Sequence, residues 1–170
     1  MDSLHRIRTF GDPVLGVETK DVTRFDASLH QLSQVMISVM HRAGGVGLAA
    51  NQIGVSRRVF VYQLLDDGAA PGVCVNPRLL DRSIEREEQD EGCLSVPGLY
   101  YPTVRHERVS LAAMDVNGEA FEIAAVGLLA RIFQHECDHL DGRLFLSRLT
   151  KPRRRNALRQ IRAGALDTAE

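Results

Sequence analysis

The chain has 170 residues, of which 44% are hydrophobic and 25% charged, and its formal net charge is -1. This length suffices for one domain whose core needs no disulfide or metal to hold it, and the charge balance offers no global basic excess for binding DNA. A metal in such a chain would serve chemistry rather than folding.

Neither the cysteines nor the apolar segments indicate export or a membrane. Cys74, Cys93 and Cys137 are too few, and odd in number, for a disulfide framework. Apolar runs fall short of the ~20 residues of a membrane span, and residues 1–10 lack the apolar stretch of a signal peptide. We therefore expect a cytoplasmic protein with reduced thiols, and a compact monomer is the default expectation.

The first predicted element is an amphipathic helix capped by Asp26 or Ser28. Apolar residues recur along it at helical intervals from Leu29 to Met40, and Gly44 ends it. Its apolar stripe predicts a helix that packs on the core.

Strands are predicted next, at residues 58–65 and 73–75. Residues 103–114 form a longer strand candidate. The dipeptide at 117–118, Asn-Gly, is favoured in a type I′ turn, which would return the chain through residues 119–124. This region should be a hairpin.

A second helix is predicted from Val126 through His139, with Gly142 suited to cap its carboxyl end. There is no repeat or linker. The order helix, strands, hairpin, helix predicts an α+β fold, a compact single domain with small antiparallel sheets around this central helix.

Charge is concentrated in two segments. Between Asp81 and Glu91 there are six acidic and two basic residues, whereas Lys151 to Arg162 holds six basic and no acidic residues. The second segment is typical of a short basic helix after Pro152, which is either a solvated terminus or a surface for an anionic partner.

The central helix carries the pattern His-Glu-x-x-His, with His135, Glu136 and His139. Residues four apart lie on one helix face, so both imidazoles can reach one divalent ion while the carboxylate flanks it. This spacing is typical of metal-dependent hydrolases, including endopeptidases.

A catalytic metal usually has three protein ligands and an open position, so a third donor is needed. No His or Cys follows Gly142, which directs the search upstream to Cys93. A lone buried cysteine is by default a structural residue of the core. The Gly/Ala-rich segment 45–52 favours tight packing or a phosphate cradle, although it lacks the Lys-Ser/Thr of a P-loop.

Taken in series, three segments resemble the signature motifs of the peptide deformylases. They are Gly-x-Gly-Leu-Ala-Ala-x-Gln at 45–52, Glu-Gly-Cys-Leu-Ser at 91–95 and Gln-His-Glu-x-Asp-His-Leu-x-Gly at 134–142. Gly-Asp-Pro-Val-Leu at 11–15 also resembles that family. The resemblance implies a metal-dependent deformylase catalytic domain, placed at residues 1–150, with 151–170 as a basic C-terminal helix or tail of the same domain.

The resemblance also implies roles for particular residues. Cys93, His135 and His139 would hold the metal. Glu136 would act as general base and acid, and Gln52 and the backbone N–H of Leu94 would donate to the oxyanion. The groove for the substrate backbone and the pocket for methionine would be formed by Gly45, Val46, Gly47, Glu91, Gly92, Leu128, Arg131 and Ile132.

The implied reaction is hydrolytic removal of the N-formyl group from the initiator N-formylmethionine of newly synthesised polypeptides, by a metal-bound water that Glu136 activates. By resemblance the native ion is Fe(II), whereas ligand chemistry alone names zinc first, and nickel or cobalt could substitute. The basic tail would associate with the ribosome.

Some positions leave alternatives open. Arg131 stands where the family often has an aliphatic residue, so it would either make the pocket polar and clamp a substrate carbonyl or extend along the helix to solvent. Tyr100 departs from members with a basic residue there. Asp138 could orient a ligand imidazole, and Cys137, off the histidine face, is not expected to be a ligand. A binding protein that keeps the metal is the alternative to an enzyme.

Overall fold

The computed structural model describes residues 6–64 and 68–165. The end of the predicted strand 58–65 and residues 166–170 of the predicted tail lie outside the described residues. Among the described residues, each helix is too short or too polar to cross a membrane.

Within the part of the chain that the structure describes, the strands form two antiparallel sheets. The larger sheet has five strands, in the spatial order β1 (Gly47–Ala49), β2 (Val59–Tyr62), β3 (Gly72–Arg82), β6 (Arg108–Met114) and β7 (Ala120–Val126). The smaller sheet is a hairpin of β4 (Arg86–Cys93) and β5 (Val96–His106). The predicted α+β fold is therefore confirmed.

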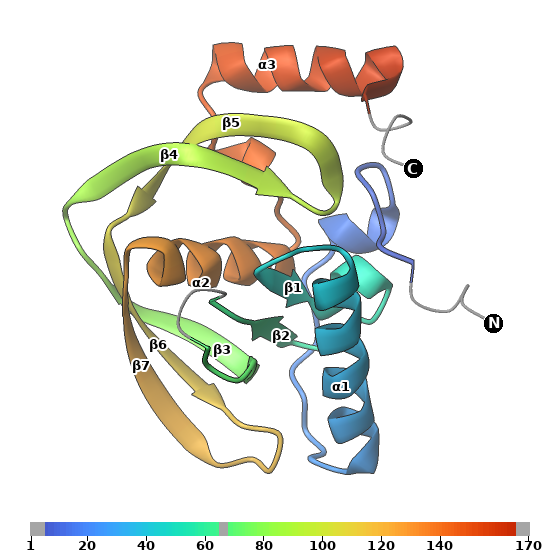
Figure 1. The fold of residues 1–170 in the computed structure, drawn as a ribbon, viewed down its shortest axis with the longest axis vertical. Coiled ribbons are helices and arrows are strands. Elements are labelled where there is room, and N and C mark those ends of the chain that lie inside the picture. The colour runs from blue at the N-terminus through green and yellow to red at the C-terminus, as the bar shows by residue number, and fades with distance from the viewer. Residues whose placement is uncertain (1–5, 65–67, 166–170) are drawn as a thin grey trace.

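Three α-helices among the described residues complete the fold (Figure 1): α1 (Ala27–Arg42), α2 (Gly127–Leu140) and α3 (Lys151–Gln160). In Figure 1, α2 lies between the β4–β5 hairpin and the larger sheet, and α3 lies beyond β5 at the top. The helix with the His-Glu-x-x-His pattern is thus central, as predicted, and is covered on two sides.

The local signals explain the helix bounds. The Asp26 carboxylate caps α1 by accepting N–H groups from Ser28 and Leu29 at 3.0 and 3.4 Å, and the helix ends just before Gly44 at φ 65°. At the end of α2, Gly142 has φ 70° and donates its N–H to His139 O. Both predicted helices are confirmed.

The strand candidate at 103–114 was wrong as a single element. Its first part belongs to β5 and its second part to β6, and the chain passes between the two sheets at Glu107. The Glu107 N–H donates to Glu85 O, just before β4. After Glu107 the chain continues as β6, which pairs with β3. The sequence does not show this change of sheet, because the residues of β5 and β6 are extended alike and strand propensity runs on across Glu107.

The hairpin after β6 is confirmed, but its predicted turn type was wrong. A type I′ turn needs positive φ at both central residues. Gly118 has φ 87°, whereas Asn117 does not have positive φ. Instead the Asp115 carboxylate accepts the N–H groups of Asn117 and Glu119 at 2.8 and 2.9 Å, which closes a longer turn.

Three apolar clusters hold these elements together. One fills the space between α2 and the larger sheet around Phe60 and Phe133, and a second packs α1 on β1–β3. The third joins β5 to the carboxyl-terminal segment through Tyr101, Phe145 and Ala157. The β4–β5 hairpin, whose first strand ends at Cys93, is therefore held between α2 and α3.

Candidate active site

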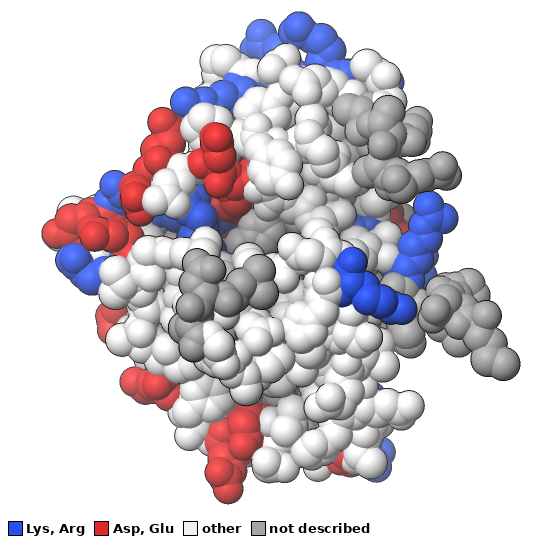
Figure 2. All heavy atoms as spheres, viewed as in Figure 1, with Lys and Arg blue, Asp and Glu red and all other residues white. Residues whose placement is uncertain are grey.

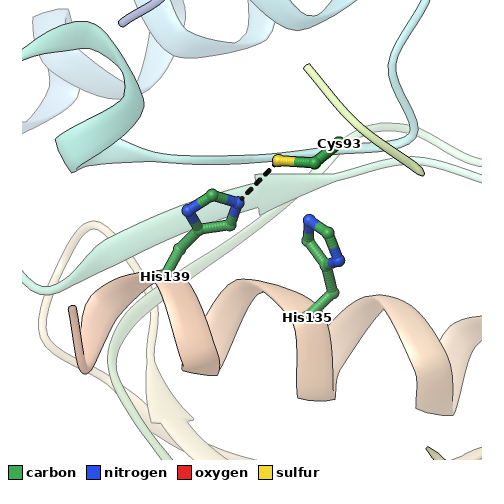
Figure 3. A group of neighbouring side chains, drawn as sticks. All are labelled: Cys93, His135 and His139. Atoms are coloured by element: carbon green, nitrogen blue, oxygen red, sulfur yellow. Dashed lines mark hydrogen bonds between the residues drawn. The ribbon is translucent and has the colours of Figure 1, made fainter. Parts of the chain in front are cut away.

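The three predicted metal ligands come together at the middle of the molecule. The donor atoms of Cys93, His135 and His139 all lie within 4.8 Å of one another, and Cys93 Sγ is 3.1 Å from His139 Nε2. Figure 3 shows the two imidazoles rising from α2 toward Cys93, which comes from the hairpin above it. Residues separated by more than forty positions in the sequence thus form one cluster.

Local structure places each donor. His135 and His139 are one turn apart on α2, with ring centroids 4.9 Å apart. Cys93 ends β4, and the Ser95 N–H donates to its Sγ at 3.4 Å, which orients the sulfur.

The donor set fits a divalent metal. A thiolate and two imidazoles are the ligands that zinc and similar ions take in proteins, and ligands of one tetrahedral ion lie roughly 3–4 Å apart. His139 is fully buried, and a buried pair of imidazoles beside a sulfur needs a shared partner. The cluster is the one group of its kind among the described residues.

Glu136 lies beside this cluster as a buried carboxylate. It is only 3% exposed, and its Oε2 has no hydrogen-bond partner among the described residues. Burial raises its pKa to about 7, because a charged carboxylate loses its hydration there. A carboxyl group whose pKa lies near neutral pH can both accept and return a proton.

The Gln52 side chain is oriented toward the cluster by the backbone of Ala49. It lies in the 3₁₀ turn η2 (Ala50–Ile53), and its Oε1 accepts the Ala49 N–H at 2.9 Å. This leaves Nε2 directed at Ser95 Oγ, 3.1 Å away, and Cys93 Sγ, 3.8 Å away. The amide donor therefore faces the Cys93 side of the site.

Glu91 has a role that the sequence did not reveal. Its Oε1 lies 2.6 Å from His135 Nδ1 and 2.6 Å from an Arg105 nitrogen, and its Oε2 accepts from Arg105 at 3.0 Å and from Arg131 at 2.8 Å. These contacts fill both oxygens of the carboxylate. Such a partner fixes the orientation of an imidazole whose other nitrogen faces a metal.

Burial and neighbouring charges shift the pKa values of the groups at this cluster in different directions. Burial would raise the pKa of Glu91, but hydrogen bonds from His135 and Arg105 outweigh it and hold that pKa well below its usual range. Burial would lower the pKa of His135, but Cys93 and Glu91 raise it overall. Burial lowers the pKa of His139.

A cavity of about 390 Å³ opens from this cluster to the surface. Every residue predicted for the substrate groove and pocket lines it, as do Gln52, Leu94 and Glu136. Tyr100, which is 70% exposed, lies at its mouth. The structure therefore brings together in one pocket residues from three separate sequence motifs.

Two interpretations of single residues were wrong. Arg131 does not extend to solvent, because it is 6% exposed and its guanidinium contacts Glu91 and the backbone oxygens of Thr103 and Glu87. Asp138 does not orient an imidazole, because its oxygens accept from Arg105 and Arg148. Whether Arg131 also meets a substrate carbonyl stays a prediction.

Arg105 was missed altogether. It lies within the predicted strand 103–114, at an inward position of β5, and is 4% exposed. A signal was present, because an arginine on the inward face of a strand requires a buried carboxylate. Cys137 lies in the apolar cluster between α2 and the larger sheet, away from the donors.

The fold and the site define a class, that of hydrolases with a cluster of one cysteine and two histidines that could hold a metal ion. Comparison with known proteins identifies which one. The polypeptide deformylase family matches residues 4–155. A peptide deformylase of Acidothermus cellulolyticus is 51% identical over 156 residues, covering 92% of this chain and 84% of the relative, and peptide deformylase 1 of Corynebacterium efficiens is 48% identical, covering 92% and 94%.

Solved structures of peptide deformylases have the same fold as this chain. The crystal structure of a peptide deformylase from Legionella pneumophila has a TM-score of 0.90 at 40% identity and covers 99% of both chains. That of Thermus thermophilus has a TM-score of 0.88 at 41% identity, with 96% of both chains covered. The chain belongs to the peptide deformylase family. It is a metalloenzyme that hydrolyses the N-formyl group from nascent peptides.

Proposed function

We propose that Cys93, His135 and His139 hold the catalytic metal and that Glu136 is the group that moves the proton. The observation that carries this proposal is the buried Glu136 carboxyl, with its unpartnered Oε2 and raised pKa, next to the three donors. When bound, a divalent metal supplies Lewis acidity, which polarises a carbonyl and lowers the pKa of water.

The chain's own groups would carry the steps in order. Glu136 accepts a proton as water attacks the formyl carbon, and the charge that develops on the formyl oxygen is met by Gln52 Nε2 and the Leu94 N–H. Glu136 then returns the proton to the amine that leaves. Its pKa of about 7 suits both transfers near neutral pH.

The apolar part of the pocket would select methionine. Leu128, Ile132 and the stem of Arg131 line it, and Gly45, Val46, Gly47 and Gly92 line its entrance. A glycine lets a neighbouring group approach the backbone closely, as at Gly92, where a Cβ would meet the Tyr100 ring at 2.4 Å. We propose that the formylated peptide lies along this entrance as an added strand.

For the native ion we propose Fe(II), with zinc, nickel or cobalt as substitutes. A thiolate with two imidazoles accepts each of these ions. Thiolate donation lowers the Lewis acidity of the metal, and the proton-accepting Glu136 compensates for this loss.

The catalytic unit would extend over residues 1–150, with the basic segment after it as part of the same domain. Ala157 of α3 is fully buried against β5, and Asn156 and Gln160 donate to Tyr101 Oη at 3.1 and 2.9 Å. We propose that the outer face of α3 binds the ribosome. Its exposed arginines gather at the top of Figure 2.

The test uses two peptides that differ only in the blocking group, formyl-Met-Ala-Ser and acetyl-Met-Ala-Ser, incubated with anaerobically purified protein. Mass spectrometry should show loss of the formyl group and no change in the acetylated peptide. Cleavage of an internal peptide bond would indicate an endopeptidase, and removal of both blocking groups would refute the proposed selectivity.

A further inference from the structure

Arg131 is a buried arginine in the pocket wall that the reaction itself does not require. It lies one turn before His135 on α2 and is 6% exposed. Its Nη1 donates to Glu91 Oε2 at 2.8 Å and to Thr103 O at 2.9 Å, and its Nη2 donates to Glu87 O at 3.1 Å. A single guanidinium therefore contacts α2's partner strands β4 and β5 together.

The position of this contact matters for the donors. Glu91 accepts from Arg131 on Oε2 and meets His135 on Oε1, so two residues of one helix face share one carboxylate. Glu91 is two residues before Cys93 on β4. Arg131 thus links the strand that supplies the cysteine to the turn of α2 that supplies the first histidine.

A second contact holds the hairpin on α2 elsewhere. Arg105 of β5 donates to Asp138 at 2.6 Å, beside His139. Arg105 also binds Glu91, so the carboxylate stays paired if Arg131 is lost. Gln134 of α2 also binds the backbone of β5, at its last residue His106. What Arg131 adds is the direct bond from α2 to the backbone of β4 at Glu87 and of β5 at Thr103.

We propose that Arg131 is a positioning residue of the metal centre: it fixes the β4–β5 hairpin against α2 and so sets Cys93 and His135 at the spacing that retains the metal. The planar guanidinium is suited to this task because it holds three acceptors in fixed directions, which an ammonium group cannot do. This inference rests on the proposed ligands Cys93, His135 and His139.

Arg58 provides a matched control. It is 5% exposed, donates to Asp141 at 2.8 Å and to Pro77 O at 3.2 Å, and also binds a carboxylate at α2. Neither of these two partners lies on the β4–β5 hairpin. Arg58→Met should therefore lower stability as any buried arginine loss does, without changing the metal centre.

The experiment loads wild type, Arg131→Met and Arg58→Met with Co(II), then measures the rate of metal release to a chelator, the visible Co(II) spectrum and the melting temperature. Loss of a residue that orients a ligand typically costs ~10–100-fold in metal affinity. We expect release from Arg131→Met to be faster by at least ~10-fold with an altered spectrum, and release from Arg58→Met to stay within about twofold of wild type.

Release from Arg131→Met at the rate of Arg58→Met, with an unchanged spectrum, would overturn the proposal. If Arg131→Met does not accumulate as folded protein, Arg131→Lys takes its place, and wild-type release from that variant overturns the proposal equally. Should the wild type fail to retain Co(II), or retain it after Cys93→Ser, the metal centre itself is wrong and the inference falls with it.

Discussion

Helices α2 and α3 both carry many charged side chains, but these side chains are mostly buried in α2 and mostly exposed in α3. In α2, ten of fourteen residues are buried, including Arg131, Glu136 and Asp138. In α3, Ala157 alone is buried, and most of the arginines face solvent. Burial of an ion costs several kcal/mol unless it is paired, whereas an exposed arginine costs almost nothing.

The difference teaches where to look for function. Arg131 and Asp138 of α2 are paired into a network with Glu91 and Arg105, whereas Glu136 Oε2 has no hydrogen-bond partner among the described residues and lies next to the Cys93–His135–His139 cluster. The charges of α3 make few contacts, such as the ion pair of Arg153 with Glu88. Changes in α2 and its partners should therefore abolish chemistry, while changes in α3 should affect association only.

The largest effect is expected from Cys93→Ser. A neutral alcohol replaces an anionic soft donor, and because even the loss of a partner to a ligand costs ~10–100-fold, loss of the ligand should cost more. Metal analysis after gel filtration should show depleted metal, with activity reduced in parallel. Full metal content in the variant would show that Cys93 is not a ligand.

Gly47→Ala should come next. A Cβ at this position would lie 2.4 Å from Glu136 Oε1, so the carboxylate must move. Since misplacement of a reacting group by about 1 Å can cost ~10²-fold, kcat should fall by roughly that factor while metal content stays unchanged. Gly16→Ala is the control, because a Cβ there meets no atom within 4 Å. Equal rates for the two variants would contradict the placement of Glu136.

A smaller effect is expected from pH. Glu136 accepts a proton only when ionised, so activity should be lost as pH falls through its pKa. Burial raises that pKa to about 7, and a divalent cation nearby would lower it from this value. The acid limb of kcat/KM should therefore lie below about pH 7, with about tenfold lost per unit. A rate that increases as pH falls would be incompatible with this role, provided metal content is constant.

Changes in α3 should have the smallest effect on chemistry. Charge reversal of Arg154, Arg155 and Arg159 to Glu leaves Ala157 in place, so peptide deformylation should stay near wild type, as surface substitutions change stability by only about 0.5 kcal/mol. Salt-sensitive co-sedimentation with ribosomes should be lost. Reversal of three exposed arginines elsewhere, Arg24, Arg82 and Arg86, is the control. Equal sedimentation of the two variants would remove the proposed partner surface.

This comparison also explains what the sequence could predict. The caps and periodicity of α1 and α2 are local signals, and the donor spacing on α2 follows from helix geometry, so both could be predicted. The pocket residues were reached through the family resemblance, and Leu128, Arg131 and Ile132 lie outside its three motifs. Contacts within one helix turn or one motif are encoded in neighbouring residues.

The remaining features depend on partners distant in the sequence. The acidic segment that forms β4 has low strand propensity and becomes a strand because β5 pairs with it from Arg86 to Cys93. The bonds of Glu91 to Arg105 and Arg131 join residues fourteen and forty positions apart. No local pattern shows which carboxylate a buried arginine will meet.

The account's central claim is that Glu136 moves the proton at a metal centre held by other residues. Glu136→Gln tests it most directly, with kcat and metal stoichiometry measured on the same preparation. The amide keeps the shape but cannot accept a proton, so kcat should fall by at least ~10²–10⁴-fold with metal content near wild type. Activity that survives, or metal that is lost together with activity, would contradict the claim.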